Sequence, residues 1–299
     1  MANGRFRANG LFLAVDGGGT GCRARLTDPS GIRLGEASGG PANIRFGPSD
    51  AFASVCEVTL ACLEQARLTA ADLPRITACL ALAGATEPAE LAAATLHPQA
   101  FGRAILTSDA HAACVGAHYG NDGAVIIAGT GSIGWAVLRG RQYRVGGWGL
   151  EISDEGSGAW LGRETLRRVL SAYDGRTAWT SLLRAVFEQY GSDPHAIVGW
   201  IARATPRDLG ALAPAVIAHA ARDDEAALGL LRIGAAHLDA IAARLVALGA
   251  PRLALVGGLA PHIESRLSSS PRERLVAPLG DALDGALQIA HRAVQSAAA

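Results

Sequence analysis

The stretch Leu11-Phe12-Leu13-Ala14-Val15-Asp16-Gly17-Gly18-Gly19-Thr20 decides the fold of this chain. Its first five residues form an apolar run typical of a buried strand, and the aspartate and glycines that follow predict a turn. Residues 22–27 alternate as a second strand, residues 28–31 have the composition of a turn, and residues 32–37 predict a third strand. The chain is therefore expected to open with an antiparallel meander.

Helices and strands alternate after this meander. The expected helices cover about residues 49–66 and 88–96 and begin again at Asp109, and the expected strands cover residues 76–82 and 104–106. This order builds a mixed sheet with helices packed on it.

The strand–glycine–strand pattern then returns. Residues 124–128 form a second apolar run, and the glycine turn after it leads into two further expected strands. The rest is expected to be mostly helical from residue 153 to about 248, with its longest helix at 225–248, then a strand and a final helix. The later strands are expected at residues 133–138, 142–145 and 253–256, and the final helix at about 280–293.

The return of the pattern predicts a structural repeat and two domains. A chain of 299 residues is long enough to bury two cores. The boundary is expected near residues 116–123, which gives an N-terminal domain of residues 1–117 and a C-terminal domain of residues 118–299. The expected fold class is α/β, with a mixed sheet and helices in each domain.

Arginine supplies all 27 basic residues, because the chain contains no lysine. A Walker A loop and a protein kinase each place a lysine on the phosphates, so both classes are disfavoured, and lysine Schiff-base chemistry is excluded. The 27 acidic residues balance the basic ones. No surplus of positive charge argues for nucleic acid or an anionic membrane as a partner.

Cysteine usage indicates a reducing compartment. The chain has five cysteines, an odd number without Cys-x-x-Cys spacing, so neither a disulfide framework nor a zinc site is expected. The apolar run at residues 11–15 is too short for a signal peptide. The longest uncharged stretch, residues 123–138, is broken by glycines and suits two strands better than a membrane helix. A cytoplasmic protein is expected.

Three apolar strands end in glycine turns. They are Asp16-Gly17-Gly18-Gly19-Thr20, Gly129-Thr130-Gly131-Ser132 and Gly257-Gly258. Glycine lets the backbone approach a phosphate closely and point amide hydrogens at it, and hydroxyl groups add donors. Asp16 could hold Mg²⁺ through water. Each turn alone has an ordinary structural explanation, such as a hairpin, but together and in this order they predict a site for ATP and Mg²⁺.

In these turns the chain resembles the superfamily of actin, the heat-shock chaperone ATPases and the sugar kinases. The resemblance covers almost the whole chain, and it is strongest to the branch of N-acetylglucosamine kinases, bacterial glucosamine kinases and BadF/BadG-type ATPases. It implies two actin-like, ribonuclease H-like domains with a cleft between them. It also implies that the first two turns clasp the phosphates from opposite domains, while the third supports the adenosine.

The segment Thr107-Ser108-Asp109-Ala110-His111-Ala112-Ala113 carries the resemblance further. In similar kinases the aspartate at this strand end is the catalytic base, which accepts the proton of the sugar hydroxyl during phosphoryl transfer. Asp109 is expected to have this role and to contact the sugar. The alternative is that Asp109 or Ser108 only caps the following helix.

Three further places are expected to line the sugar pocket. Similar amino-sugar kinases carry the pattern Gly146-Gly147-Trp148-Gly149 followed by Asp154-Glu155-Gly156-Ser157. Trp148 offers an apolar face to a sugar ring, and Asp154 can accept hydrogen bonds from sugar hydroxyls. Asn43 matches an asparagine that contacts the sugar. The structural alternatives are a core tryptophan, a helix N-cap formed by Asp154 with Ser157, and a turn-forming asparagine.

The resemblance implies an ATP-dependent kinase that phosphorylates glucosamine or N-acetylglucosamine at the 6-hydroxyl. Ala83 and its neighbours lack a serine found in N-acetylglucosamine enzymes, whereas the Trp148 pattern favours the acetylated sugar, so the 2-substituent stays open. The alternatives are a BadF/BadG-type ATPase that activates a reductase and a non-catalytic sugar sensor. The expected partner is a small amino sugar, and a homodimer stays open.

Overall fold

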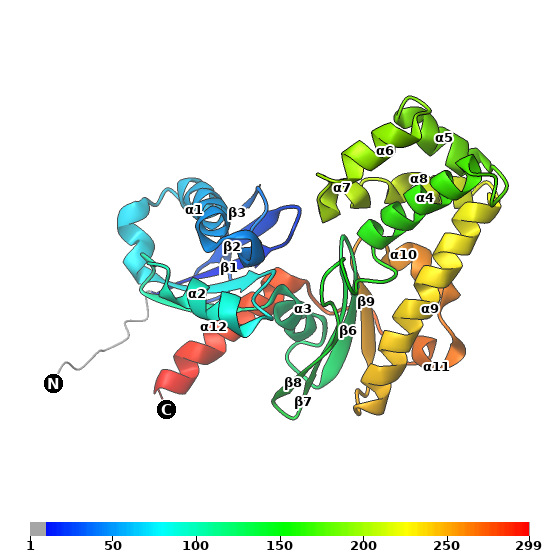
Figure 1. The fold of residues 1–299 in the computed structure, drawn as a ribbon. Helices are drawn as coiled ribbons and strands as arrows, with labels where there is room; N and C mark the ends of the chain where they lie inside the picture. The colour runs from blue at the N-terminus through cyan, green and yellow to red at the C-terminus, as the bar shows by residue number, and fades with distance from the viewer. Residues whose placement is uncertain (1–9, 299) are drawn as a thin grey trace. The chain divides into compact units, whose positions relative to one another are not determined.

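The computed structural model describes residues 10–298, which form two compact units (Figure 1). The first unit contains the described residues up to Asp122 and those from Pro278 onward, and the second contains Gly123–Ala277. This division differs from the expected boundary after residue 117, because the end of the chain returns to the first unit. The reason is that α12 (Ala282–Ala298) buries Leu283, Ala286 and Ala290 against the first sheet.

The sheet of the first unit contains five strands. They are β1 (Leu11–Gly17), β2 (Cys22–Thr27), β3 (Arg33–Gly39), β4 (Ile76–Leu82) and β5 (Arg103–Thr107), in the order β3-β2-β1-β4-β5. The first three form the expected antiparallel meander, and β1, β4 and β5 run parallel. The register aligns Asp16 with Ala81 and Ala81 with Thr107. The carboxyl ends of the parallel strands therefore meet at one edge of the sheet.

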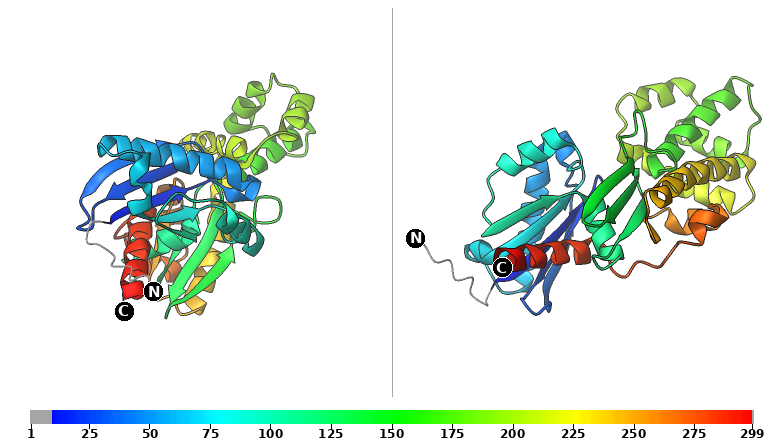
Figure 2. Two further views of the ribbon diagram at one scale, coloured as in Figure 1. Left: turned by 90° about the vertical axis from the view of Figure 1, so that its left-hand side faces the viewer. Right: turned by 90° about the horizontal axis from the view of Figure 1, so that it is seen from below.

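Helices cover both faces of this sheet. Leu11, Leu13 and Val15 pack in one core with α1 (Pro48–Gln65), whereas Phe12 and Ala14 pack in another with α3 (Asp109–Ala117) and α12. The ribbon views show α1 and α12 on opposite sides of the strands (Figures 1 and 2). A strand buried on both faces reads as a continuous apolar run, which explains why β1 and β4 are so apolar. The helix α2 (Pro88–Leu96) precedes β5.

The helices α3 and α12 touch through their backbones. A Cβ atom at Gly285 would lie 1.9 Å from the carbonyl oxygen of Ala112, and one at Gly116 would lie 1.9 Å from that of Asp281. Glycine is needed at both positions because a side chain would separate the helices. This close crossing holds the end of the chain against the helix that begins at Asp109.

The sheet of the second unit repeats the arrangement of the first. Its strands are β6 (Gly123–Ala128), β7 (Ser132–Leu138), β8 (Arg141–Gly146) and β9 (Leu253–Val256), in the order β8-β7-β6-β9. An antiparallel meander again has a parallel strand on the far side of its first strand. This agreement in topology supports the structural repeat predicted from the sequence.

The helices of the second unit pack on one another and reach the second sheet chiefly through α9 (Glu225–Ala247). They are α4 (Gly158–Tyr173), α5 (Ser181–Gln189), α6 (Pro194–Ile201), α7 (Pro206–Gly210), α8 (Ala213–Ala220), α9, α10 (Ala260–Ile263) and α11 (Ser269–Arg272). By length and composition α9 is the one described helix that could cross a membrane, but it buries residues such as Leu230 and Leu238 in the core of this unit. Short 3₁₀ turns lie at Ile44–Phe46, Ala70–Arg75 and Glu264–Arg266.

Candidate active site

The carboxyl edge of the first sheet gathers the predicted residues of the first unit. Asp16 lies near the end of β1, and Asp109 begins α3 two residues after β5 ends. The segment of Asn43 joins this edge, because Asn43 bridges Ala83 just beyond β4 and the amide of Ala42 donates to the carbonyl of Gly18 over 3.0 Å. Three predicted elements, distant in sequence, therefore meet at one edge.

The first glycine turn is closed by a bond from the amide of Gly18 to the carbonyl of Gly21, 2.9 Å long. Gly19 and Thr20 form its exposed tip, and no described residue accepts a hydrogen bond from their amides. Exposed amides without an acceptor in the described chain are the kind of donor that a phosphate group needs. The first glycine turn therefore has free donors at its tip.

Asp16 is held by an arginine that the sequence analysis did not single out. Oδ2 of Asp16 accepts a hydrogen bond from Arg23, 2.8 Å long, and the other terminal nitrogen of Arg23 donates to Asp281 over 3.0 Å. The alternation of arginines at positions 23 and 25 of β2 was a signal for one charged face of the sheet. The pairing of Arg23 with Asp281 could not be foreseen, because the two residues are 258 positions apart.

Asp109 does not cap its helix through its side chain. Oγ of Ser108 accepts the hydrogen bond from the amide of His111, 3.1 Å long, and is the N-cap. Oδ1 of Asp109 accepts from the amide of its neighbour Ala110 over 2.8 Å. Of the two capping alternatives, the structure therefore assigns the cap to Ser108.

The surroundings of Asp109 favour its protonated form. Burial, followed by the negative charge of Asp16, raises its pKa to about 6, although the Ala110 amide acts in the other direction. A carboxylate with a pKa close to neutral is suited to accept a proton at physiological pH. Asp109 thus has the electrostatic properties of a general base.

Asn43 has a structural role in addition to any contact with a ligand. Its Oδ1 accepts a hydrogen bond from the amide of Arg45, 3.0 Å long, and caps a short 3₁₀ turn. The turn-forming alternative is therefore realised. The bond uses the carbonyl end of the side chain, so the amide group, a donor, is the end that could meet a sugar oxygen.

The second glycine turn is fastened to the start of α4. The amides of Gly158 and Ala159 donate to the carbonyls of Gly129 and Thr130 over 2.8 and 3.1 Å. The first amides of α4 are thus already used. The amides of Thr130 and Gly131 have no acceptor among the described residues, so this turn, rather than the helix end, offers donors to an anion.

The third glycine turn lies beside the second. β9 runs parallel to β6, and the amide of Leu259 donates to the carbonyl of Ala128 over 3.0 Å. Gly257 has φ +100°, and a Cβ atom there would lie 2.4 Å from the same carbonyl oxygen. Gly257 and Gly258 are both exposed. The structure therefore brings the two predicted nucleotide turns of the second unit together.

The predicted sugar segment of the second unit lies against the second glycine turn. Oδ1 of Asp154 accepts from the amide of Gly149 over 3.2 Å. A Cβ atom at Gly131 would lie 2.8 Å from Oδ2 of Asp154, so the carboxylate borders the phosphate turn. The N-cap of α4 is Ser157, whose Oγ accepts from the amide of Trp160. The capping alternative, which named Asp154 with Ser157, is therefore realised at Ser157.

Trp148 is a surface residue rather than part of the core. Its side chain is 53% exposed, and the guanidinium carbon of Arg144 lies 3.7 Å from the centre of its ring. Arg144 also donates to the carbonyls of Gly146 and Gly147. The core alternative is excluded, and one face of the indole is covered by a cation that sequence reasoning missed.

The donor set fits a magnesium ion that arrives with a nucleotide. No group of three or more His, Cys, Asp or Glu side chains able to hold a metal ion occurs among residues 10–298. Mg²⁺ is commonly bound through one or two carboxylates together with the phosphates of a substrate and several waters. Asp16, with its carboxylate beside the first phosphate turn, meets that requirement.

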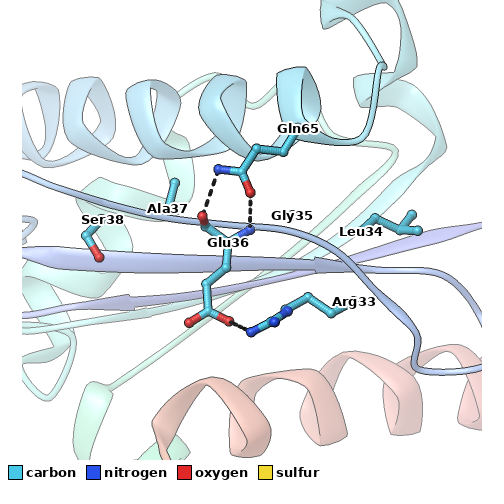
Figure 3. Close-up of a pocket in the computed structure, with 7 residues that line it drawn as sticks. All are labelled: Arg33, Leu34, Gly35, Glu36, Ala37, Ser38 and Gln65. Atoms are coloured by element: carbon cyan, nitrogen blue, oxygen red, sulfur yellow. Dashed lines mark hydrogen bonds and ion pairs between the residues drawn. The ribbon is translucent and has the colours of Figure 1, made fainter.

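Two cavities lie outside these residues. One, of about 440 Å³, follows the edge strand β3, where the amide group of Gln65 bonds the backbone N–H and C=O of Glu36 over 3.0 and 2.9 Å (Figure 3). The other, of about 380 Å³, is an apolar groove beside α1 that contains Phe52 and His97. No predicted site residue lines either cavity.

Comparison with known proteins identifies relatives along almost the whole chain. Glucosamine kinase GspK of Vibrio cholerae is 39% identical over 279 residues, which are 93% of this chain and 95% of that protein. An N-acetylmuramic acid/N-acetylglucosamine kinase of Clostridium acetobutylicum is 30% identical over 175 residues, which are 57% of this chain and 56% of that one.

The solved structures that resemble this chain include sugar kinases, as the sequence relatives do. A crystal structure from Chromobacterium violaceum, provisionally named an N-acetylglucosamine kinase, superposes with a TM-score of 0.88 and 36% identity, covering 95% of this chain and all of that one. A glucokinase of the ROK family from Streptomyces griseus has a TM-score of 0.56 and 16% identity over 95% of this chain and all of that one, and shows the fold alone. The expected α/β class with two actin-like domains is confirmed. The model of the BadF/BadG/BcrA/BcrD ATPase family matches residues 13–270, and the chain belongs to this family.

Proposed function

We propose that this protein is an ATP-dependent amino-sugar kinase that phosphorylates glucosamine or N-acetylglucosamine at the 6-hydroxyl. One observation carries the proposal: Asp109, at the carboxyl edge of the first sheet, is released from capping by Ser108 and has a pKa raised to about 6. The relatives named above, a glucosamine kinase above all, support the substrate class.

Asp109 is the general base of the proposed reaction. It accepts the proton of the 6-hydroxyl as the sugar oxygen forms its bond to the γ-phosphorus of ATP, and ADP leaves with the electrons of the broken P–O bond. The desolvation that raises the pKa of Asp109 makes it basic enough for this transfer, yet it is ionised at neutral pH. Ser108 supplies the N-cap of α3, so the Asp109 side chain is not needed for that bond.

The glycine turns bind the nucleotide. The amides of Gly19, Thr20, Thr130 and Gly131 donate to phosphate oxygens, and Gly257 with Gly258 leaves room for the adenosine. Asp16 would hold Mg²⁺ through water, and the ion would supply charge neutralisation at the phosphates. The chain has no lysine, so amides and the metal have a larger share of this task than in Walker A proteins.

In this proposal, polar and aromatic groups hold the amino sugar. Asn43 donates from its amide group, Asp154 accepts from ring hydroxyls, and the exposed indole of Trp148 covers an apolar patch of the sugar. The backbone of Gly147 and Gly149 shapes the segment that carries Trp148, and Gly147 has φ +70°.

A reductase-activating ATPase and a sugar sensor have less support. The cysteines at positions 22, 62, 79 and 114 are buried, and no cysteine follows Cys114, so the second half of the chain has no thiolate for an iron–sulfur cluster. A sensor would have no use for a base with a raised pKa. We also place the kinase in the cytoplasm, as a homodimer or a monomer, acting on a free small-molecule sugar.

A coupled ADP-release assay tests the function. The purified protein with MgATP is given glucosamine, N-acetylglucosamine, N-acetylmannosamine or glucose in turn, and the product is analysed by ³¹P–¹H NMR to locate the phosphate. ADP formation that depends on one of the first two sugars, with phosphate on O6, is the expected result. Equal ADP release with and without sugar would exclude the kinase function.

A further inference from the structure

Arg23 lies between two carboxylates at the edge of the candidate site. One terminal nitrogen donates to Oδ2 of Asp16 over 2.8 Å, and the other donates to Oδ2 of Asp281 over 3.0 Å. Asp16 and Arg23 are direct cross-strand neighbours on β1 and β2, so the backbone register brings them together. The side chain of Asp16 is 22% exposed and that of Arg23 is 43% exposed, so solvent ions can reach the pair.

The far end of Arg23 is fixed by a second set of ion pairs. Asp281 and Asp284 cap α12 reciprocally, since each accepts a hydrogen bond from the amide of the other over 3.0 and 2.9 Å. Arg25, on the same face of β2, binds Asp284 over 2.6 Å and Glu36 over 2.8 Å. Arg23 is thus anchored on a helix end, and its guanidinium is presented to Asp16 in a set position.

The ion pair between Arg23 and Asp16 affects whether a metal ion can bind before the nucleotide does. Asp16 near the end of β1 and Asp109 just after β5 lie at the same carboxyl edge of the first sheet, so this edge carries two carboxylates. Such a pair attracts a divalent cation, and a cation bound before the nucleotide would occupy the place of the metal that the nucleotide brings. Arg23 cancels the charge of one member of the pair.

We propose that Arg23 is the counter-ion of Asp16 in the nucleotide-free protein and prevents divalent cations from binding there until the nucleotide supplies them. Arg23 acts through Asp16 and is a positioning residue rather than a catalytic one. The inference rests on the proposed function only in assigning Asp16 to the nucleotide-borne metal. The counter-ion role explains why Asp16, a proposed metal-binding carboxylate, forms an ion pair with an arginine in the nucleotide-free protein.

The experiment measures Mn²⁺ binding to the nucleotide-free protein by electron paramagnetic resonance, which counts free Mn²⁺ directly. Arg23→Gln removes the charge beside Asp16, and we expect Mn²⁺ to bind about tenfold more tightly than to the wild type. Arg25→Gln is the matched control, because it removes an equal charge from the same strand and breaks ion pairs with α12 without touching Asp16. Its Mn²⁺ affinity should stay within about threefold of the wild type.

Two further variants identify the site. Asp16→Asn combined with Arg23→Gln should return Mn²⁺ binding to the wild-type level, and Arg23→Lys, which keeps the charge, should show no gain. Arg23→Met replaces Arg23→Gln if the latter fails to fold, since it keeps the apolar stem. An unchanged or weaker Mn²⁺ affinity in Arg23→Gln, or a gain that survives Asp16→Asn, would overturn the inference.

The kinase assay on the wild type separates the two proposals. Sugar-dependent ADP formation together with unchanged Mn²⁺ binding in Arg23→Gln would reject the counter-ion role alone. Absence of sugar-dependent ADP formation would reject the function, whatever the metal titration shows.

Discussion

Asp109 is the residue whose ionisation should control activity at acid pH. Its pKa is raised to about 6, chiefly by burial and secondarily by the charge of Asp16, and only its ionised form can accept a proton. We predict that kcat/KM falls about tenfold per pH unit below about pH 6, which steady-state rates between pH 5 and 8 will measure. Asp16→Asn should move this acid limb to lower pH. A profile that is flat down to pH 5 would contradict the assignment.

The raised pKa of Asp109 also leads to a prediction about the stability of the fold. The folded state holds the proton of Asp109 up to about pH 6, whereas an unfolded chain releases it near 3.8, so the destabilisation by ionised Asp109 grows between these pH values and is complete above about pH 6. Asp109→Asn should therefore be more stable than the wild type by about 3 kcal/mol at pH 8. At pH 4 the difference should nearly vanish. Urea unfolding at both pH values tests this, and an equal difference at both would show that charge is not the cause.

Trp148 should affect sugar binding and leave stability alone. Its indole is exposed, and its described contact is with the guanidinium of Arg144, so little core packing is lost on truncation. Trp148→Ala should raise the KM for the amino sugar about fivefold, since a lost aromatic contact is worth about 1 kcal/mol. Trp135→Ala is the contrast, because Trp135 is buried and should cost about 3–5 kcal/mol of stability. A large fall in Tm for Trp148→Ala would show that Trp148 has a structural role.

At the scale of elements, the two phosphate turns should respond differently to an added methyl group. A Cβ atom at Gly18 would come no closer than 3.4 Å to the chain, so Gly18→Ala is compatible with the fold. It should still weaken MgATP binding, measured by calorimetry, because the methyl group occupies phosphate space. If a folded Gly18→Ala variant bound MgATP with unchanged affinity, the first glycine turn would not be part of the nucleotide site.

Gly131→Ala should disturb nucleotide and sugar together. Its Cβ would lie 2.8 Å from Oδ2 of Asp154, so the carboxylate must move. We expect the KM values for ATP and for the amino sugar both to rise, whereas Gly18→Ala should chiefly affect ATP. Steady-state kinetics with each substrate varied in turn will show whether the two effects are coupled. A change confined to ATP would separate Asp154 from the sugar.

Asp224 joins two helices of the second unit. Oδ1 accepts from the amide of Ala227 in α9 over 3.0 Å, and Oδ2 accepts from the amide of Leu182 and the hydroxyl of Ser181 in α5. Asp224→Ala should cost about 2–4 kcal/mol in urea unfolding, because it removes a cap and leaves buried donors without acceptors. Asp193→Ala, which removes an exposed cap from α6, should cost about 1 kcal/mol. Equal costs would show that the link between α5 and α9 is unimportant.

For the whole molecule, local patterns predicted the strands and missed the long-range contacts. The strands β2, β4 and β9 have the expected bounds, because apolar alternation and flanking turns are local signals. β3 begins one residue later than expected, since the amide of Ile32 is bound by Asp28 in the turn. The expected helical region after residue 153 divides into short helices at caps such as Thr180 and Thr205.

The return of α12 to the first unit could not be read from the sequence. Its apolar periodicity predicted a helix, but the choice of sheet depends on the glycine contact of Gly116 with Gly285 and on the pairs of Arg23 and Arg25 with its first turn. The same holds within the candidate site. Motifs identified Asp16, Asp109 and the glycine turns, whereas Arg23 and Arg144 became visible only once the register of the strands was known.

The rate of ADP formation by Asp109→Asn on the preferred amino sugar tests the central claim most directly. The substitution keeps the shape of the side chain but removes most of its basicity, so turnover should fall by roughly 10²–10⁴-fold with little change in sugar affinity. Ser108→Ala is the control for helix capping, and it should lose about 1 kcal/mol of stability but keep turnover within about threefold. Near-normal turnover in Asp109→Asn would contradict the account, because a kinase that works without this carboxylate has its base elsewhere.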